Sequence, residues 1–394
     1  MIPRTKVNYL AGQLLKALTV TERSTHHRNL LIGMLSNYLH TDNVILMPSG
    51  RCGLYCILKA VNHMKRVIIP AYTCKAVAEA ALMAGKEIVY VDIEENSFNM
   101  DASALEKVLV DKSVVIATHQ FGIPCRIKEI IELCRKRDSL VIEDAAASLG
   151  TRIDGKLTGA FGDAAFFSFD STKLINVPMK GGFVIAKDPT LCKKIHEVCD
   201  AELRPMPVGH KFKLFILAFI LTMIENPFLY RIFHTVYFQF RGKCTEESPD
   251  LDLAKGPFYS YSMTEWQAAI AVRQIENIHY IIKTRQDLYA YYFSCLSGMS
   301  SCVLPPEDLK KEWACIRFPI RIKGNKMSFY HKAVKKGIDF AFSFTYPPCP
   351  EGFVNSRHLA DAVLDIPYYL KLDRNECDFI VSVLKNIDQN GGVT

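Results

Sequence analysis

Residues 66–91, RVIIPAYTCKAVAEAALMAGKEIVYV, decide the fold class of this chain. Two short apolar runs, at 67–70 and 88–91, enclose a segment whose apolar residues recur at helical spacing. The same alternation extends outward, with VILM (44–47) and RCGLYCILKAVNHM (51–64) before it and VVIATHQFG (114–122), RIKEIIELCRKRD (126–138) and SLVIED (139–144) after it. Continuous apolar strands between helices predict βα units and a largely parallel sheet covered on both faces, which is an α/β domain.

The chain continues beyond this repeat into a second, smaller unit. AAFFSF (164–169) and GGFVIAKD (181–188) follow without a long helix between them, which indicates late strands joined by loops. A helical segment from about Thr264 to Leu296 is long enough to bridge to the smaller unit, where 315–322 predicts a strand and 327–337 and 374–387 predict helices. Because 394 residues exceed what one core usually accommodates, we expect a large α/β domain at 1–260 and a small α+β domain at 261–394.

Composition and charge exclude several classes of protein. The chain is 49% hydrophobic and 23% charged, as globular proteins are, and its net charge of +7 is not concentrated in a basic block, so nucleic-acid binding is not expected. The cysteines, thirteen in number and without a CxxC pair, indicate reduced and mostly buried thiols, with no metal site and no disulfide framework. Since Met1–Val20 lacks the apolar core of a secretion signal, we expect a cytoplasmic protein.

An apolar insertion at about 205–245 interrupts this organisation. Its central part, residues 211–241, reads KFKLFILAFILTMIENPFLYRIFHTVYFQFR. The uninterrupted apolar piece, Leu214 to Ile224, is far shorter than the roughly 20 residues that span a bilayer, and Glu225-Asn226-Pro227 breaks it. Two short apolar helices flanked by Lys and Arg would suit a peripheral contact with the inner face of the membrane. A buried insertion or a dimer contact explains the composition equally well.

Residues able to hold a cofactor gather in two later segments. SLVIEDAAASLG (139–150) places Glu143 and Asp144 at the end of a buried strand, where open α/β sheets bind ligands. GDAAFFSFDSTK (162–173) places Ser168 and Lys173 five residues apart in a loop after an apolar strand. A carboxylate, a hydroxyl and an amine in this order are the groups that pyridoxal 5′-phosphate (PLP) requires for its ring nitrogen, its phosphate and its imine.

From residue 30 to residue 390 the chain resembles the DegT/StrS type of sugar aminotransferases, a branch of the aspartate-aminotransferase fold (fold type I). The blocks that carry the resemblance are PSGRCGLYCIL (48–58), THQFGIP (118–124), VIEDAAASLG (141–150), FGDAAFFSFDSTK (161–173), GGFVIA (181–186), MTEWQAAIAVRQIENI (263–278) and IPYYLKLDRNECDFIVSVL (366–384). The resemblance implies a mostly parallel sheet of the seven-stranded type, with Lys173 carrying PLP as a Schiff base, Asp144 pairing with its pyridinium nitrogen and Ser168 contacting its phosphate. Gly50 and Arg51 resemble the Gly-Thr turn whose amides meet that phosphate at a helix N-terminus.

Two departures from the family pattern fall on the cofactor itself. Arg51 replaces the Thr of that turn, so that its guanidinium either holds the phosphate or points at an anionic substrate. Cys74 stands where an aromatic residue normally stacks on the cofactor ring, unless Tyr72 takes that place. The core chemistry is retained in this chain while its surroundings differ.

Other departures bear on the substrate. Ala147 replaces the usual Gln after EDAA, and Met179-Lys180 replaces the usual Gly-Glu before Gly-Gly. Ser260-Tyr261-Ser262 replaces the Asn-Tyr-Arg that reaches the cofactor of the partner subunit in the family. His119, at the end of another strand, is either a polar wall of the substrate pocket or a packed, hydrogen-bonded histidine. Tyr346, in TYPPCP, falls where related enzymes line the substrate mouth from the small domain.

The resemblance implies a homodimeric PLP enzyme that transfers an amino group from an amino acid, with glutamate expected, to a keto sugar. The acceptor would be nucleotide-linked or lipid-linked and serve polysaccharide or glycoconjugate biosynthesis. Two alternatives stay open, a PLP enzyme of another reaction type such as a dehydratase, and a non-catalytic scaffold or regulatory protein with the same fold. Sugar dehydratases of this type replace the lysine, so Lys173 favours transamination.

Overall fold

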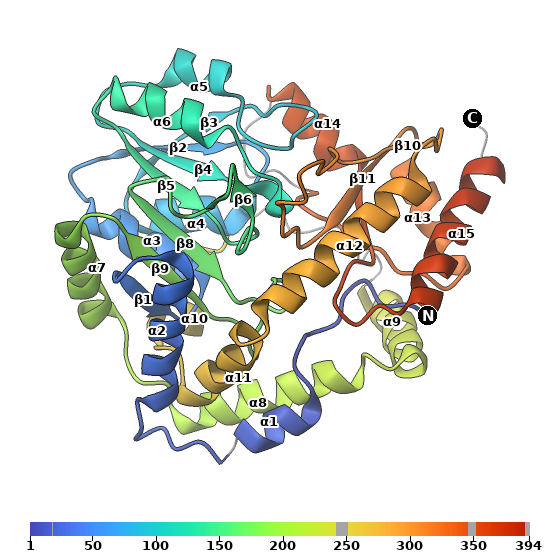
Figure 1. The fold of residues 1–394 in the computed structure, drawn as a ribbon, viewed down its shortest axis with the longest axis horizontal. Coiled ribbons are helices and arrows are strands. Elements are labelled where there is room, and N and C mark those ends of the chain that lie inside the picture. The colour runs from blue at the N-terminus through green and yellow to red at the C-terminus, as the bar shows by residue number, and fades with distance from the viewer. Residues whose placement is uncertain (18, 242–250, 346–351, 391–394) are drawn as a thin grey trace.

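A seven-stranded sheet forms the centre of the larger part of the chain (Figure 1). In this computed structural model, which describes residues 1–17, 19–241, 251–345 and 352–390, the strand order is β1-β9-β8-β5-β4-β2-β3. The strands are β1 (Val44–Met47), β2 (Arg66–Pro70), β3 (Glu87–Val91), β4 (Val114–Thr118), β5 (Leu140–Asp144), β8 (Ala164–Ser168) and β9 (Gly182–Ala186). Strands β3, β2, β4, β5 and β8 run parallel, and β9 lies antiparallel between β8 and β1. The predicted α/β fold with a mostly parallel sheet is confirmed.

Helices cover both faces of this sheet because the side chains of each buried strand alternate between two apolar cores. On one face, α3 (Gly50–Ala60), α4 (Lys75–Met83) and α7 (Pro189–Glu202) pack with Val67 and Ile69 of β2. On the other face, α5 (Ala102–Val108) and α6 (Ile127–Arg135) pack with Ile68 of the same strand. A one-turn 3-10 helix (Gln120–Gly122) and a short hairpin of β6 (Arg152–Ile153) and β7 (Lys156–Leu157) complete this region.

The segment predicted as one bridging helix is two helices, α11 (Glu265–Ile275) and α12 (Ile278–Leu296). Asn277, a residue with weak helix propensity, lies at the break and donates a side-chain hydrogen bond back to the carbonyl of Arg273 at 2.9 Å. Helix α11 packs along α2 (His26–Leu39), and α1 (Ala11–Ala17) lies beside α11 and α8 (Val208–Met223). The N-terminal residues and the bridging helices therefore share one core with the sheet.

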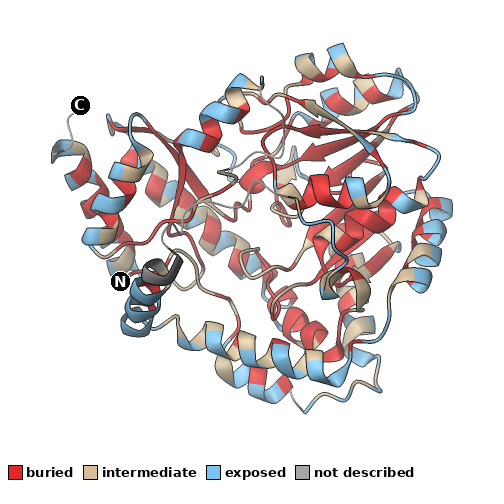
Figure 2. Cartoon of the chain, turned by 180° about the vertical axis from the view of Figure 1, so that it is seen from behind, coloured by how far each residue is buried: buried red, intermediate tan, exposed pale blue. Residues whose placement is uncertain are grey.

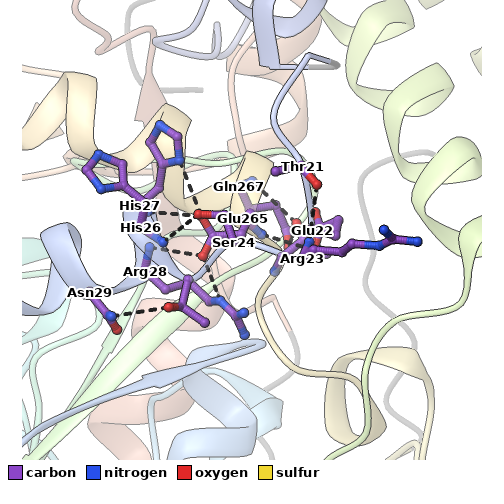
Figure 3. Close-up of polar contacts among 12 residues, drawn as sticks. Thr21, Glu22, Arg23, Ser24, His26, His27, Arg28, Asn29, Glu265 and Gln267 are labelled. Carbon is purple, nitrogen blue, oxygen red and sulfur yellow. Dashed lines mark hydrogen bonds and ion pairs between the residues drawn. The ribbon is translucent and has the colours of Figure 1, made fainter.

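Figure 3 shows how α11 is attached to the start of α2. The buried carboxylate of Glu265 accepts hydrogen bonds from the backbone N–H of His27 and from Nε of Arg28, both at 2.9 Å, at the positive end of the α2 dipole. Two residues along, the side-chain amide of Gln267 donates to the carbonyl oxygens of Pro178 at 3.0 Å and Lys180 at 2.9 Å. Helix α11 thereby holds the segment that carries Lys180.

A three-stranded antiparallel sheet, β10 (Cys302–Val303), β11 (Phe318–Ile322) and β12 (Val363–Ile366), forms the second layer of the molecule. Helices α13 (Lys326–Lys335), α14 (Val354–Ala362) and α15 (Arg374–Asn390) and the second half of α12 enclose its core. The strand predicted at 315–322 and the helices predicted at 327–337 and 374–387 are present. The chain start also reaches this part, because Ile2 pairs with Ile338 in an isolated bridge. The division at residue 260 stays a prediction.

The apolar insertion forms two helices, α8 (Val208–Met223) and α9 (Pro227–Arg241), followed by the single turn α10 (Pro257–Ser260). Helix α8 runs along one edge of the molecule and α9 turns away at its end (Figure 1). In the described chain, no single helix has both the length and the apolar composition to cross a membrane. Helix α8 and the stretch Pro227–Tyr237 pass that test only as a pair, and the pair is bent by 112°.

Candidate active site

A cavity of about 280 Å³ lies at the carboxyl ends of the central strands, between the large sheet and the small sheet. Open α/β sheets bind their ligands at this edge because the loops that follow the strands converge there. Eight of the eleven residues predicted for the site line the cavity. They are Gly50, Arg51, Cys74, Asp144, Ala147, Ser168, Lys173 and Lys180.

Asp144 is the last residue of β5 and faces this cavity with 6% of its surface exposed. Its Oδ1 accepts the backbone N–H of Ala146 at 3.1 Å, and the hydroxyl of Thr118 lies beside the carboxylate from the neighbouring strand β4. Burial raises the pKa of the Asp144 carboxyl, and the positive charge of Lys173 acts in the opposite direction. A protonated ring nitrogen would supply the additional positive partner that this buried carboxylate favours, so Asp144 fits the pyridine end of PLP.

Lys173 lies in the loop between β8 and β9 and lines the cavity. Its backbone N–H donates to the carbonyl of Asp170 at 2.9 Å, and its own carbonyl accepts the side-chain amide of Asn176 at 3.2 Å. The N–H of Asn176 in turn donates to Oε1 of Gln274 at 3.0 Å. The loop that presents the lysine is therefore fixed to α11.

The opposite end of the cavity is built to receive an anion. Ser49 caps α3 by accepting the N–H of Cys52 at 3.2 Å, which leaves the amides of Gly50 and Arg51 to face outward at the helix N-terminus. Ser168 lies against this turn, since a Cβ built on Gly50 would come within 3.1 Å of the Cβ of Ser168. Backbone amides, a helix dipole and a hydroxyl at one point fit the phosphate of PLP.

Two cationic side chains, Arg51 and Lys180, also line the cavity, and each lies near an acidic side chain. Nη1 of Arg51 lies 3.4 Å from Oε2 of the buried Glu79. Nζ of Lys180 lies 3.8 Å from Oδ2 of Asp170 and 5.3 Å from the ring centroid of Phe258. Burial lowers the pKa of the Lys180 ammonium, and Asp170 acts against this. Arg51 is the second residue of α3, so its guanidinium can contact an anion that is bound at the N-terminus of this helix.

Tyr72 does not line the cavity, so the structure contradicts the alternative in which its ring replaces the missing stacking residue. Its side chain is fully buried, its hydroxyl donates to the carbonyl of Ser343 at 3.3 Å, and its ring packs edge-on against Phe121 and Phe344. Phe121 and Phe344 line the cavity, and Tyr72 packs behind them. Cys74, which is exposed, occupies the lining position instead.

His119 does not line the cavity either, and its assignment to the substrate pocket is corrected. The ring is fully buried, with Nε2 3.0 Å from Oε2 of Glu143 and with Nδ1 accepting the N–H of Cys125 at 3.2 Å. It is the packed, hydrogen-bonded histidine of the two alternatives. Tyr346 lies outside the described residues.

The small sheet and the segments beside it contribute residues to the cavity that the sequence did not indicate. Four of them are Arg317, which directly precedes β11, and Phe342, Ser343 and Phe344. Nη1 of Arg317 lies 3.2 Å from Oδ2 of Asp365, and the Ser343 hydroxyl donates to the same oxygen. Only tertiary structure brings these residues to the site, so local sequence pattern carries no sign of them. Phe121, in contrast, lines the cavity from within the THQFGIP block, where a sequence signal does exist.

Residues 27–385 match the model of the DegT/DnrJ/EryC1/StrS aminotransferase family. The GDP-perosamine synthase of Caulobacter vibrioides is 25% identical over 369 residues, which cover 89% of this chain and 87% of that protein. The sugar aminotransferase CalS13 of Micromonospora echinospora superimposes with a TM-score of 0.75 at 18% identity, over 98% of this chain and 100% of that one. The PLP form of the putative sugar aminotransferase Spr1654 of Streptococcus pneumoniae gives 0.73 at 18% identity, over 99% of both chains. The fold and enzyme class inferred from the sequence are thus confirmed, and the chain belongs to the DegT/DnrJ/EryC1/StrS aminotransferase family.

Proposed function

We propose that this protein binds PLP through Lys173 and transfers an amino group from an amino acid, with glutamate as donor, to a keto group of a sugar. One observation carries this proposal. Asp144 and Lys173 face one cavity whose other end is formed by the N-terminus of α3 and Ser168. No other cofactor of amino-group transfer requires a buried carboxylate, a lysine and a phosphate cradle in this arrangement.

When bound, PLP supplies a carbonyl that condenses with amines and a ring that withdraws electrons from the amine carbon. Asp144 holds a proton at the ring nitrogen, because a buried carboxylate stabilises the positive charge there. The amine of Lys173 would move a proton to and from the donor carbon. The bonds from Asn176 and Asp170 keep its backbone in place during both tasks.

The phosphate end orients the cofactor. The amides of Gly50 and Arg51 and the Ser168 hydroxyl hold the phosphate, and the guanidinium of Arg51 adds a charged contact. Gly50 and Arg51 begin helix α3 and Ser168 ends strand β8, so these groups would hold the phosphate from two elements of regular structure.

The wall supplied by the small domain bears on the substrates. We assign Arg317 to a carboxylate of the amino donor, since its guanidinium faces the cavity while Asp365 fixes one side of it. For the acceptor, the Caulobacter relative is named a GDP-perosamine synthase, and another relative, from Acidithiobacillus ferrooxidans, is named a UDP-N-acetyl-3-dehydro-alpha-D-glucosamine 3-aminotransferase. These names support a nucleotide-linked keto sugar, and a lipid-linked one is the alternative.

The visible absorbance of the purified protein with PLP tests this proposal. We expect a band of lysine-bound cofactor that is absent from Lys173→Ala and that is lost when glutamate is added. A band that persists with every amino acid would favour the non-catalytic scaffold. If the protein dehydrated a keto sugar and transferred no amino group to it, the dehydratase-like reaction would be favoured.

We also propose that the protein acts as a homodimer in the cytoplasm, at the inner face of the membrane. The dimer follows from the family resemblance, and light scattering of the purified protein tests it. The membrane location follows from the apolar segment at 211–241.

A further inference from the structure

The outer faces of α8 and α9 are apolar although they face solvent. Twenty large hydrophobic side chains are exposed in the described chain, and ten of them belong to these two helices. On α8 they are Val208, Phe212, Ile216, Ile220 and Met223, and on α9 they are Phe228, Leu229, Ile232, Phe233 and Val236. Their spacing of mostly three or four residues places them along one side of each helix. Figure 2 shows the exposed side of α8 along the edge of the molecule.

The inner faces of both helices are already engaged. Leu214 and Ala218 of α8 belong to the main core. Glu225, between the helices, accepts the N–H of Val7 at 2.7 Å and pairs with Lys371 at 2.8 Å. The Tyr230 hydroxyl of α9 donates to the buried Asp339 at 2.5 Å. The helices are fixed in this orientation, so their outer residues cannot turn inward.

The apolar surface is larger than scattered exposed residues account for. A helix of 16 residues is about 24 Å long, and α8 exposes apolar side chains over this whole length. Leu10 and Leu15, at 56% and 53% exposure, extend the surface at α1, which packs on α8. Continuous apolar surfaces of this kind mark sites that contact a protein or a membrane.

The charged side chains that α8 and α9 themselves present to solvent are cationic. Between residues 208 and 241 the sequence has a single acidic residue, Glu225, and it is directed inward to Lys371. Lys213 and Arg231 are exposed, and in the part of the chain that the structure describes neither has an acidic partner. Lys211 pairs with Glu22 at 3.3 Å. An apolar surface bordered by unpaired cations is complementary to anionic headgroups over an acyl core.

We propose that the outer faces of α8 and α9 are a docking surface for an anionic lipid bilayer. A second copy of the chain fits less well, because α8 and α9 offer no acidic side chain that would pair with Lys213 and Arg231 of the other copy, since Glu225 already pairs with Lys371. The pair lies on the bilayer and does not cross it, since the helices are bent by 112° and their inner faces hold the protein. This inference does not depend on the amino-group chemistry of the cavity.

Co-sedimentation of the full-length, PLP-loaded protein with vesicles tests the surface. We expect binding to vesicles of phosphatidylglycerol and phosphatidylcholine, weaker binding to phosphatidylcholine alone, and a decrease with added salt. The variant Phe212→Ser/Ile216→Ser/Ile220→Ser should bind at least about tenfold more weakly. The variant Leu309→Ser is the matched control, because Leu309 is 81% exposed in the small domain.

The cofactor band reports whether each variant is folded, because none of the substituted residues lines the cavity. A variant that loses vesicle binding and keeps the band separates this inference from the proposed function. Lys213→Gln/Arg231→Gln provides a milder change, which should reduce binding and its dependence on salt. Absence of binding to phosphatidylglycerol vesicles would overturn the proposal. A triple variant that changes from dimer to monomer without vesicles would also overturn it and would assign the surface to a second copy.

Discussion

Nε2 of His119 lies 3.0 Å from Oε2 of Glu143, and both side chains are fully buried. Because the N–H of Cys125 donates to Nδ1, Nε2 carries the proton and donates it to the carboxylate. Glu143 accepts three further hydrogen bonds, each from a backbone N–H. The donors are Gly159, Phe161 and Gly162. Of the two adjacent carboxylates at the end of β5, Glu143 supports the loop and Asp144 faces the cavity.

Replacement of Glu143 by Ala should destabilise the protein strongly. It would leave four donors without their acceptor, three of them buried, and removing one partner of such a buried charged group costs about 3–5 kcal/mol. The free energy of unfolding in urea measures this, with Glu143→Gln as a control that retains one acceptor oxygen and should lose less. Equal stability of Glu143→Ala and the unaltered protein would contradict this role.

The sequence predicted the sheet and one side of the site because both depend on local pattern. Apolar runs such as 67–70 are long enough to be recognised as strands, and a parallel sheet brings their carboxyl ends to one edge. Asp144 and Ser168 end two such strands, and Lys173 lies in the loop after the second of them. Their places near the cavity could therefore be inferred before the structure was known.

The other side of the site could not be predicted in this way. Arg317 and Phe344 reach the cavity only because the small sheet folds over the large one. Tyr72 and His119 follow strands as Asp144 does, but their rings turn into the core, where Ser343 and Glu143 bind them. Alternation along a strand or loop does not distinguish a side chain that enters a cavity from one that packs beside it.

Replacement of Asp144 by Asn should stabilise the protein without cofactor at neutral pH. Burial raises the pKa of Asp144 in the folded state above its unfolded value. The contribution of such a group to stability is complete below the unfolded pKa, near 3.9, and is lost as pH rises through the folded pKa. Asparagine does not ionise and so does not lose this contribution. Asp144→Asn should therefore be more stable than the unaltered protein at pH 7, and the two stabilities should converge toward pH 4.

The same substitution should weaken the binding of PLP. Removing one member of a buried, hydrogen-bonded charge pair lowers affinity by at least about thirtyfold. Urea unfolding of both proteins at the two pH values, with and without PLP, measures both effects. If Asp144→Asn were less stable than the unaltered protein at pH 7 without PLP, the prediction that the desolvated Asp144 carboxylate lowers the stability of the folded protein would be wrong.

Replacement of Arg51 by Thr, the residue of the family pattern, tests which anion the guanidinium holds. We expect PLP to bind about tenfold more weakly, because a charged hydrogen bond to the phosphate is lost. Inorganic phosphate should also protect the protein from unfolding less well, and this measurement needs no catalysis. An unchanged affinity for PLP together with a raised KM for the sugar would instead direct Arg51 toward the acceptor.

Replacement of Arg317 by Met should affect the donor half of the reaction alone. Methionine retains much of the apolar length of the side chain and removes the fork that we assign to the donor carboxylate. The cofactor band should therefore be unchanged, while kcat/KM for glutamate falls at least about tenfold and a neutral amine loses nothing.

The control for this experiment is a substitution of Asp365. This residue is buried, and its Oδ2 lies 3.2 Å from Nη1 of Arg317. Burial raises the pKa of the Asp365 carboxyl, and Arg317 acts against this, so Arg317→Met leaves a buried acid with less support for its charge. The variant Arg317→Met/Asp365→Asn removes that second effect. If activity with glutamate returned in the double variant, the guanidinium would serve the small sheet and not the donor; if it stayed low, the loss belongs to the contact with the carboxylate.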